Sequence, residues 1–135
     1  MYVRTLSFFL VTFIVVATMA DHHIVGREGE DIAMRYLLMS GYSLLGRNVR
    51  IGHDEIDLII FDPVDTVIVF AEVKARSKDD SDFSPLLNFT EDKKACVRRA
   101  AERWIAAQEH EWGWRIDLVL VADGKVADHL KDVGN

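Results

Sequence analysis

The sequence contains one cysteine, Cys96, in a chain of 135 residues. A single thiol cannot close an internal disulfide or build a cysteine-rich metal site, and we expect Cys96 to be a packed helix residue rather than a reactive thiol. None of the five histidines has a partner at the spacing of a metal-binding motif, and the glycines form no phosphate-cradling loop. The sequence also shows no internal repeat and no low-complexity segment. Chemistry based on thiolates, histidine-bound metals or P-loops is therefore disfavoured.

Basic residues are also in deficit, because 16 Lys and Arg face 22 Asp and Glu and the formal net charge is -6. Such a balance argues against a protein that coats nucleic acid through bulk positive charge, so any basic surface must be local. The hydrophobic share of 50% and the charged share of 28% are ordinary for a globular protein. A chain of this length has room for one substantial core, which predicts a single domain.

Residues 1–20 form an apolar leader that differs from the rest of the chain. No charge lies between Arg4 and Asp21. The run is long for a signal-peptide core and short of the roughly 18 to 20 residues that a membrane-spanning helix needs. Met19 precedes the polar start of the globular pattern, so translation starting there would make residues 1–18 a misassigned start. The leader is a signal peptide, a membrane anchor or such a misassigned start. We expect a cytoplasmic protein, with an exported or membrane-anchored one as the alternative if the leader is retained.

The segment from 21 to 135 reads as one α/β domain. Apolar residues at helical spacing predict a helix over 29–39, which Ser40 and Gly41 end. Runs rich in Val and Ile predict strands, and the turn at 62–65 predicts an antiparallel hairpin between the second and third. The expected elements are strands at 42–49, 55–61 and 66–75, a polar loop at 76–88, a helix capped by Thr90, and strands at 114–122 and 125–130.

Charge interrupts the apolar pattern most clearly in the third strand. Glu72 and Lys74 share one strand face with Phe70, because side chains alternate along a strand. A carboxylate and an ammonium on one face can act on a single bound group. The alternative is a cross-strand salt bridge on a solvated face, which contributes little stability. We favour function, because the strand is apolar on both faces and an interior strand rarely carries unused polar residues.

The second strand supplies another carboxylate, Asp57. A turn centred near Pro63 and Val64 would place Asp57 opposite Phe70 or Ala71, within diagonal reach of Glu72. Two carboxylates so close repel each other, and a divalent cation that takes oxygen ligands from both makes the arrangement favourable. The sequence therefore predicts that Asp57 and Glu72 bind magnesium.

Glu30 is a further anomaly, because it lies on the apolar face of the first helix with Ala33 and Leu37. A carboxylate in the first turn stabilises a helix through the dipole of its N-terminus. Glu30 therefore either stabilises the helix start or contributes to the site, and both interpretations stay open.

From residue 21 onward the chain resembles the YraN-type family of small bacterial proteins. The resemblance is carried by Gly26-Arg-Glu-Gly-Glu30, Ala33, Leu37, Gly41-Tyr42, Asn48, Arg50, Glu55-Ile-Asp57-Leu-Ile and Glu72-Val-Lys74-Ala-Arg76. The family is similar to the restriction-endonuclease-like superfamily, whose Asp, then Glu-x-Lys signature is matched by Asp57, Glu72 and Lys74. One residue departs from the pattern, since Asp54 stands where the family usually has Gly.

The resemblance implies a restriction-endonuclease-like core, with a mixed central sheet, a hairpin that carries the site and flanking helices. It also implies a magnesium- or manganese-dependent endonuclease that hydrolyses DNA, with branched DNA among the expected substrates. Asp57 and Glu72 would bind the metal, and Lys74 would orient the attacking water and stabilise developing charge. Glu30 matches in position the first-helix Glu of superfamily Holliday-junction resolvases, and would hold a second metal or an outer-shell water.

Four basic residues are our candidates for phosphate contact: Arg76, Lys94, Arg98 and Arg99. The alternative is that those on the helix form a solvated face. The expected partners are DNA, a second copy of the chain by analogy with branched-DNA nucleases, and a DNA-processing protein, with membrane contact only if the leader is retained. A nucleic-acid-binding or assembly module with this fold and no turnover is the alternative function.

Overall fold

The computed structural model describes residues 27–76 and 89–134. The elements in chain order are α2 (Arg27–Met39), β1 (Ser43–Ile51), β2 (Asp54–Asp62), β3 (Val67–Arg76), α4 (Glu91–Ala106), β4 (Trp114–Ala122) and β5 (Lys125–Leu130). The expected α/β pattern is confirmed, and β4 and β5 match their predicted bounds. The apolar leader over 1–20 and most of the loop expected over 76–88 lie outside the described residues.

The strands form one mixed sheet in the order β1-β2-β3-β4-β5. Neighbouring strands pair antiparallel except β3 and β4, which run parallel. Parallel neighbours need a crossover connection, and α4 lies in the segment between these two strands. This mixed sheet with its two helices is consistent with the restriction-endonuclease-like core that the resemblance implies.

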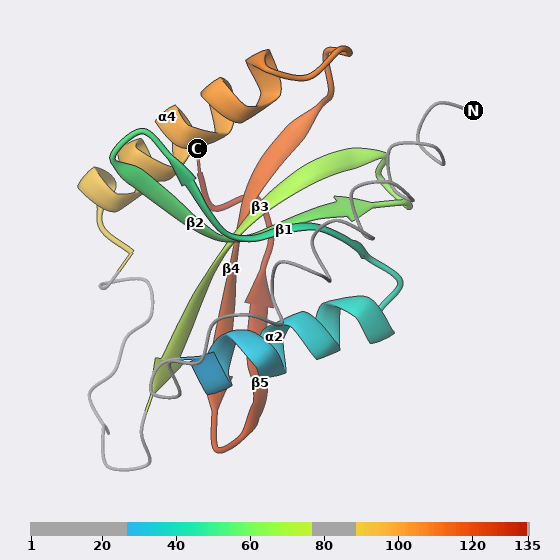
Figure 1. The fold of residues 1–135 in the computed structure, drawn as a ribbon. Coiled ribbons are helices and arrows are strands. Elements are labelled where there is room, and N and C mark those ends of the chain that lie inside the picture. Colours follow the sequence, from blue (N-terminus) through green and yellow to red (C-terminus); the bar gives the residue numbers. More distant parts are fainter. Residues whose placement is uncertain (1–26, 77–88, 135) are drawn as a thin grey trace.

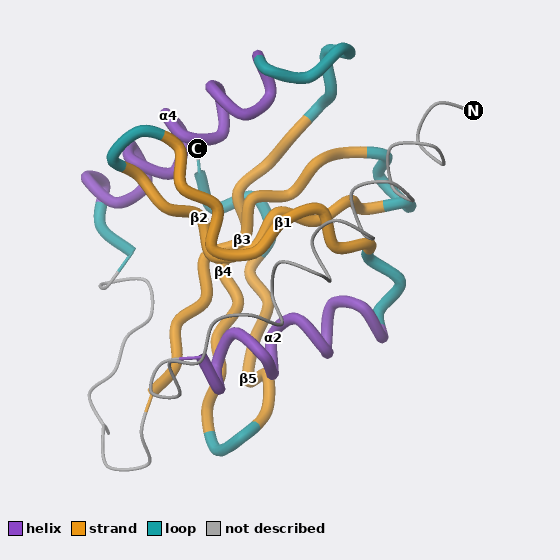
Figure 2. The backbone as a smooth tube through the Cα atoms, in the orientation of Figure 1, coloured by secondary structure: helices purple, strands orange, loops and turns teal. Residues whose placement is uncertain are grey.

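The two helices cover opposite faces of the sheet, as the ribbon shows (Figure 1). Helix α2 packs Ala33 and Leu37 into a cluster with alternate residues of the sheet such as Val69, whereas α4 packs Val97 into the cluster around Phe70. Figure 2 shows the resulting three layers, with the strands between the helices. Strand alternation thus assigns successive residues of β3 to different cores. Even-numbered residues such as Glu72 share the α4 side with Phe70.

Local sequence signals explain where several elements end. Thr90 caps α4, and its side chain accepts a hydrogen bond from the Lys93 amide at 3.2 Å. Gly41 follows α2 with a φ of 97°, a conformation that glycine adopts without steric cost. Asp123 and Gly124 both have positive φ and join β4 to β5, as a tight hairpin turn requires.

The register of the β2–β3 hairpin differs from the expected one. Leu58, not Asp57, pairs with Ala71, and the hairpin closes at the Asp62–Val67 pair. The expected turn, centred near Pro63 and Val64, was therefore too early by one residue. The physical cause of this shift in register is the Asp62 side chain. It accepts hydrogen bonds from the backbone amides of Val64 and Asp65 and so extends the turn. Asp57 and Glu72 are the next residues after the Leu58–Ala71 pair, and they lie close enough for the charge of Glu72 to raise the pKa of Asp57.

None of the helices within 27–76 and 89–134 has the length and apolar character needed to cross a lipid bilayer.

Candidate metal and phosphate site

Glu72 is the central residue of the candidate site. Its side chain is only 5% exposed, and its Oε1 lies 3.6 Å from Lys74 Nζ and 3.4 Å from Lys93 Nζ. Its second oxygen, Oε2, is buried and accepts no hydrogen bond from any described residue. A buried carboxylate oxygen without a partner carries a desolvation cost, so it marks a place where a ligand would fit.

Asp57 is fixed in place across the hairpin from Glu72. Its Oδ2 accepts a hydrogen bond from the backbone amide of Val73 at 2.8 Å. Burial, followed by the negative charge of Glu72, raises the pKa of Asp57 to about 6, although the Val73 amide and the two lysines oppose the shift. The structure therefore brings together the two carboxylates that the sequence assigns to the metal.

Glu30 approaches this pair from α2. Burial and the charge of Asp57 raise the pKa of Glu30, while Asn48 and Arg47 hydrogen-bond its carboxylate and lower that pKa in part. Arg47 Nη2 lies 3.5 Å from Glu30 Oε2, and Arg47 Nη1 lies 2.6 Å from Asp31. Glu30 thus lies near enough to Asp57 to feel its charge and is held there by β1. Its catalytic role stays a prediction.

These residues suit a partly hydrated divalent cation. Within residues 27–76 and 89–134 no three His, Cys, Asp or Glu side chains converge to enclose a metal ion on their own. Magnesium, however, usually binds through one or two carboxylates and keeps several waters or phosphate oxygens as its other ligands. A pair of oxygen donors with one unsatisfied buried oxygen, that of Glu72, fits this chemistry.

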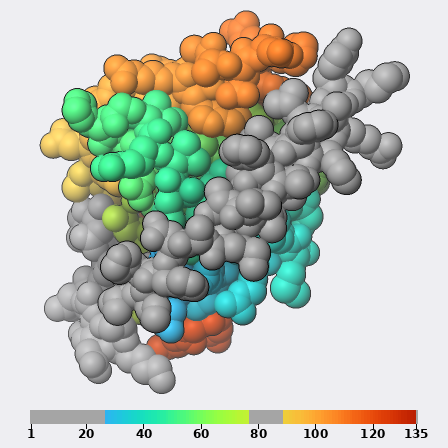
Figure 3. All heavy atoms as spheres, viewed as in Figure 1, coloured from blue at the N-terminus to red at the C-terminus, as the bar shows by residue number. Residues whose placement is uncertain are grey.

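Two of the basic residues expected to contact phosphate have partners within the protein. The Arg98 guanidinium donates a hydrogen bond to the backbone carbonyl of Gly134. Arg99 binds Asp54 through two contacts of 2.9 and 2.8 Å. Asp54 is the residue that departs from the family pattern, so its extra charge is neutralised by α4. Figure 3 shows the green β1–β2 hairpin lying against the orange helix.

The other two candidates differ from each other, because Arg76 is exposed, whereas the Lys94 side chain is only 19% exposed and also has a partner within the protein. Arg76 is exposed at the end of β3. Lys94 Nζ lies 3.2 Å from Glu91 Oε1 and 5.9 Å from the centre of the Phe89 ring. Phosphate contact by any of the four stays a prediction. Cys96, in the middle of α4, is half-buried as a packed helix residue would be.

Lys93 is the site residue that sequence reasoning missed. It stands in the first turn of α4 and reaches Glu72 from an element nineteen residues farther along the chain, at 3.4 Å. Its side-chain chemistry does not distinguish it from Lys94, its neighbour. The usable signal was the cap, since Thr90 fixes which lysine is the third residue of the helix and so which side of the helix each lysine takes.

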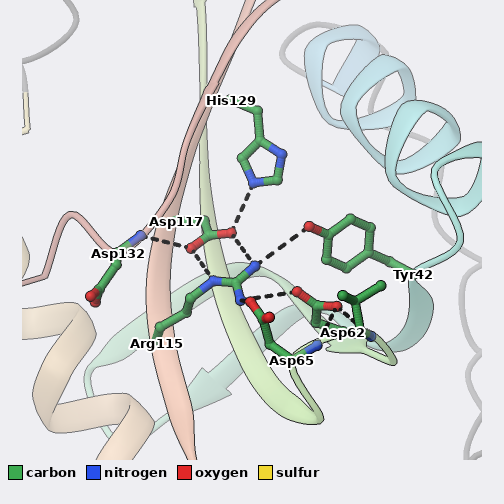
Figure 4. Close-up of polar contacts among 8 residues, drawn as sticks. Tyr42, Asp62, Asp65, Arg115, Asp117, His129 and Asp132 are labelled. Carbon is green, nitrogen blue, oxygen red and sulfur yellow. Dashed lines mark hydrogen bonds and ion pairs between the residues drawn. The ribbon is translucent and has the colours of Figure 1, made fainter.

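A second polar cluster, also missed, lies at the β2–β3 turn and is drawn in Figure 4. Arg115 Nε donates to Asp117 Oδ1 at 2.9 Å, and its Nη1 lies 2.9 Å from Asp62 and 2.8 Å from Asp65. His129 Nε2 lies 2.8 Å from the other oxygen of Asp117. Burial alone would raise the pKa of Asp117, but hydrogen bonds from His129 and Arg115 hold it below its usual value. Because these groups satisfy one another, we interpret the cluster as structural.

Comparison with known proteins gives one consistent result. The model of the uncharacterised protein family UPF0102 matches residues 29–121. A UPF0102 protein of Mycolicibacterium smegmatis is 38% identical over 116 residues, covering 82% of this chain and 92% of its own. One from Prosthecochloris aestuarii is 37% identical over 112 residues, covering 82% and 86%. One from Chlorobium chlorochromatii is 39% identical over 97 residues, covering 72% and 73%. The chain therefore belongs to the UPF0102 or YraN family, which is restriction-endonuclease-like.

Proposed function

We propose that this protein is a magnesium- or manganese-dependent endonuclease that hydrolyses phosphodiester bonds of DNA. The observation that carries the proposal is the buried Glu72 carboxylate, whose Oε2 has no partner among the described residues and whose charge acts on Asp57. Two ammonium groups converge on its other oxygen. Paired carboxylates flanked by lysine are suited to phosphoryl chemistry, in which a cation and positive side chains stabilise negative charge.

Asp57 and Glu72 would hold the cation, which supplies Lewis-acid polarisation of a phosphate oxygen and a lowered pKa for bound water. The orientation of the Asp57 side chain is restrained, because its Oδ2 accepts a hydrogen bond from the Val73 backbone amide. Lys74, on the same face of β3, donates hydrogen bonds to the water that attacks and to the phosphate as charge develops. Glu30 accepts a hydrogen bond from a water at the edge of the site.

The substrate we propose is DNA of particular shape, including branched DNA. A chain with a net charge of -6 gains little from bulk attraction to a duplex. Productive binding then depends on local basic residues and on the geometry of the nucleic acid. A second copy of the chain or a DNA-processing partner would supply further contacts.

The proposal is tested by separating cleavage from metal binding with Lys74→Ala. We expect this variant to lose on the order of a hundredfold to a thousandfold in cleavage rate, as when one preorganised donor is removed from developing charge. Metal binding should be retained, because an ammonium is not a cation ligand and Lys74 is only a competing partner of the Glu72 carboxylate. The assay offers single-stranded, duplex, flapped and four-way-junction DNA with magnesium or manganese.

The matched control is the Asp57→Asn, Glu72→Gln double variant, which should lose metal binding in calorimetry while remaining folded. Equal metal affinity in the double variant would show that the site is wrongly assigned. Cleavage at the parental rate by Lys74→Ala would refute the mechanism. A parent that binds metal and DNA but cleaves none of these substrates would instead support a non-catalytic binding module.

A further inference from the structure

The basic residues of α4 do not have the same surroundings. Arg98 and Arg99 are engaged with Gly134 and Asp54, and Lys94 faces Glu91. Lys93 alone among these four residues contacts a carboxylate of the candidate site, with its Nζ 3.4 Å from Glu72 Oε1. The helix therefore contributes one positive charge to the site, from a residue outside the family signature described above.

Lys93 and Lys74 lie between the buried carboxylate and solvent. Their side chains are 39% and 29% exposed, whereas that of Glu72 is 5% exposed. Both ammonium groups approach the same oxygen, and they come from different elements, α4 and β3. Both ammonium groups are therefore more accessible to an incoming phosphate than the Glu72 carboxylate is.

The pairing of Lys93 with Glu72 suits a protein without a bound cation. Asp57 and Glu72 repel each other, and the two lysines reduce that repulsion. A divalent cation held by the same carboxylates would repel the two ammonium groups. It would also neutralise the negative charge of Glu72 that attracts them. A lysine ammonium sits on a flexible four-carbon stem and binds phosphate readily as a point charge, so it can change partners without movement of the helix.

We propose that Lys93 exchanges partners during the working cycle of the site. Its ammonium neutralises Glu72 in the metal-free protein and contacts a phosphate of the nucleic acid when a divalent cation holds that carboxylate. The proposal rests on the proposed function, since it takes Glu72 as a metal ligand. It makes Lys93 a phosphate-binding residue whose availability depends on metal.

The test is Lys93→Met, compared with Lys131→Met as a control for net charge. Lys131 is exposed and lines a cavity near Asp62 at the far end of the β2–β3 hairpin. The first readout is calorimetric affinity for manganese without nucleic acid. We expect Lys93→Met to bind manganese about two- to fivefold more tightly, because a competing partner of Glu72 worth a surface ion pair is gone. Lys131→Met should bind as the parent does.

The second readout is affinity for a four-way-junction DNA with nuclease-resistant phosphorothioate linkages, in manganese, over a series of salt concentrations. Lys93→Met should bind more weakly, and the slope of log affinity against log salt should fall by about one. Lys93→Arg, which keeps the charge, should restore both. Urea unfolding of each variant establishes that the compared proteins are folded.

Three results would overturn the inference. The first is unchanged or weaker manganese affinity in Lys93→Met. The second is an unchanged salt slope for DNA binding by the same variant. Either result would show that the contact between Lys93 and Glu72 is only a structural ion pair. The third is equal behaviour of Lys131→Met, which would indicate bulk charge. If the parent binds metal and DNA and one of these results is found, only this inference fails. If the parent binds no divalent cation, the proposed function fails with it.

Discussion

Two aspartates of the same sheet have pKa values shifted in opposite directions. Asp57 lies beside another carboxylate, and burial and that negative charge raise its pKa to about 6. Asp117 is fully buried, but its hydrogen bonds to His129 and Arg115 lower its pKa. The contrast separates a residue that lies beside another negative charge from one whose charge is compensated by hydrogen-bond donors.

Asp57 should make the metal-free protein less stable as pH rises. Its folded pKa of about 6 lies above the ordinary value of 3.8, so the folded state binds the proton more tightly than the unfolded state. Its stabilising contribution is complete below about pH 4 and is lost as pH rises through 6. Asp57→Asn removes this pH-dependent loss of stability, because asparagine carries no charge. It also keeps a side-chain oxygen that can accept the hydrogen bond from the Val73 amide. With chelator at pH 7 we expect the variant to be more stable than the parent by on the order of 2 kcal/mol.

Urea unfolding at pH 4, 5, 6 and 7 with chelator measures the effect. The two proteins should converge near pH 4, because the parental Asp57 is then protonated in the folded state. Glu30, whose pKa is also raised, leaves a smaller slope of the same sign in the variant. A variant less stable than the parent at pH 7 would show that Asp57 is stabilised as an anion without metal.

Single residues of the site were predictable where strand alternation governs them. Asp57, Glu72 and Lys74 are polar residues within strongly apolar strands, and the structure brings all three together. Lys93 could not be found in the same way. Its place depends on how α4 lies over the sheet, and its neighbour Lys94 has the same chemistry.

At the scale of elements, the α4 cap connects helix stability with the site. The Thr90 hydroxyl accepts a hydrogen bond from the Lys93 backbone amide at 3.2 Å. It therefore orders the helical turn from which the Lys93 ammonium reaches Glu72. We expect Thr90→Ala to lower the free energy of unfolding by about 1 kcal/mol, the usual cost of losing such a cap. Thr90→Ser should cost less than half of that, because it keeps the hydroxyl.

Urea unfolding measures the free energy of unfolding of each variant. Thr66→Ser makes the same substitution as Thr90→Ser at a position outside the helix and serves as the comparison for it. If Thr90→Ala and Thr90→Ser are equally stable, the hydroxyl contributes nothing and the helix start is held by packing alone. Metal affinity offers a second measurement. It should change little in Thr90→Ala, since neither Asp57 nor Glu72 belongs to α4 and the variant keeps the Lys93 ammonium.

Elements were predicted well where periodicity and turn chemistry agree. The strands at 114–122 and 125–130 match because Asp123-Gly124 marks the turn between them. The β2–β3 register was wrong by one residue because the Asp62 side chain lengthens the turn through two backbone hydrogen bonds. A proline signal alone cannot reveal which side chain will cap the turn. Order along the sheet, with β3 parallel to β4, follows from packing across the whole chain.

The whole molecule places two charge systems at different positions along the same hairpin. The candidate site lies just beyond the Leu58–Ala71 pair, at Asp57 and Glu72, and the Arg115 cluster lies near the Asp62–Val67 pair that closes the hairpin. Arg115 joins β4 to the turn after β2, and His129 adds β5 (Figure 4). Sequence could not predict this cluster, because residues that are bonded to each other in it, such as Tyr42 and Arg115, lie up to 73 residues apart and meet only in the folded sheet.

Breaking the Arg115 cluster should destabilise the fold without weakening the metal site. Asp117 is fully buried and Arg115 is 10% exposed, so removing one partner leaves a buried charge incompletely compensated. Loss of a partner from such a pair costs about 3 to 5 kcal/mol. We expect Asp117→Ala to lie near the lower figure, because Asp62 and Asp65 still face Arg115. Asp128 is an exposed aspartate on β5, so Asp128→Ala is the matched control. It should lower the free energy of unfolding far less than Asp117→Ala does.

The pH dependence identifies the mechanism of that loss. The pKa of Asp117 is lowered, so its stabilising contribution is present above about pH 4 and disappears as pH falls through the lowered value. The difference in unfolding free energy between parent and Asp117→Ala should therefore narrow below pH 4, opposite in sign to the effect of Asp57→Asn. Urea unfolding from pH 2.5 to 7 measures both. A gap that stays constant over this range would mean that Asp117 acts through packing, whereas loss of manganese affinity in the folded variant would mean that the two charge systems are coupled along the hairpin.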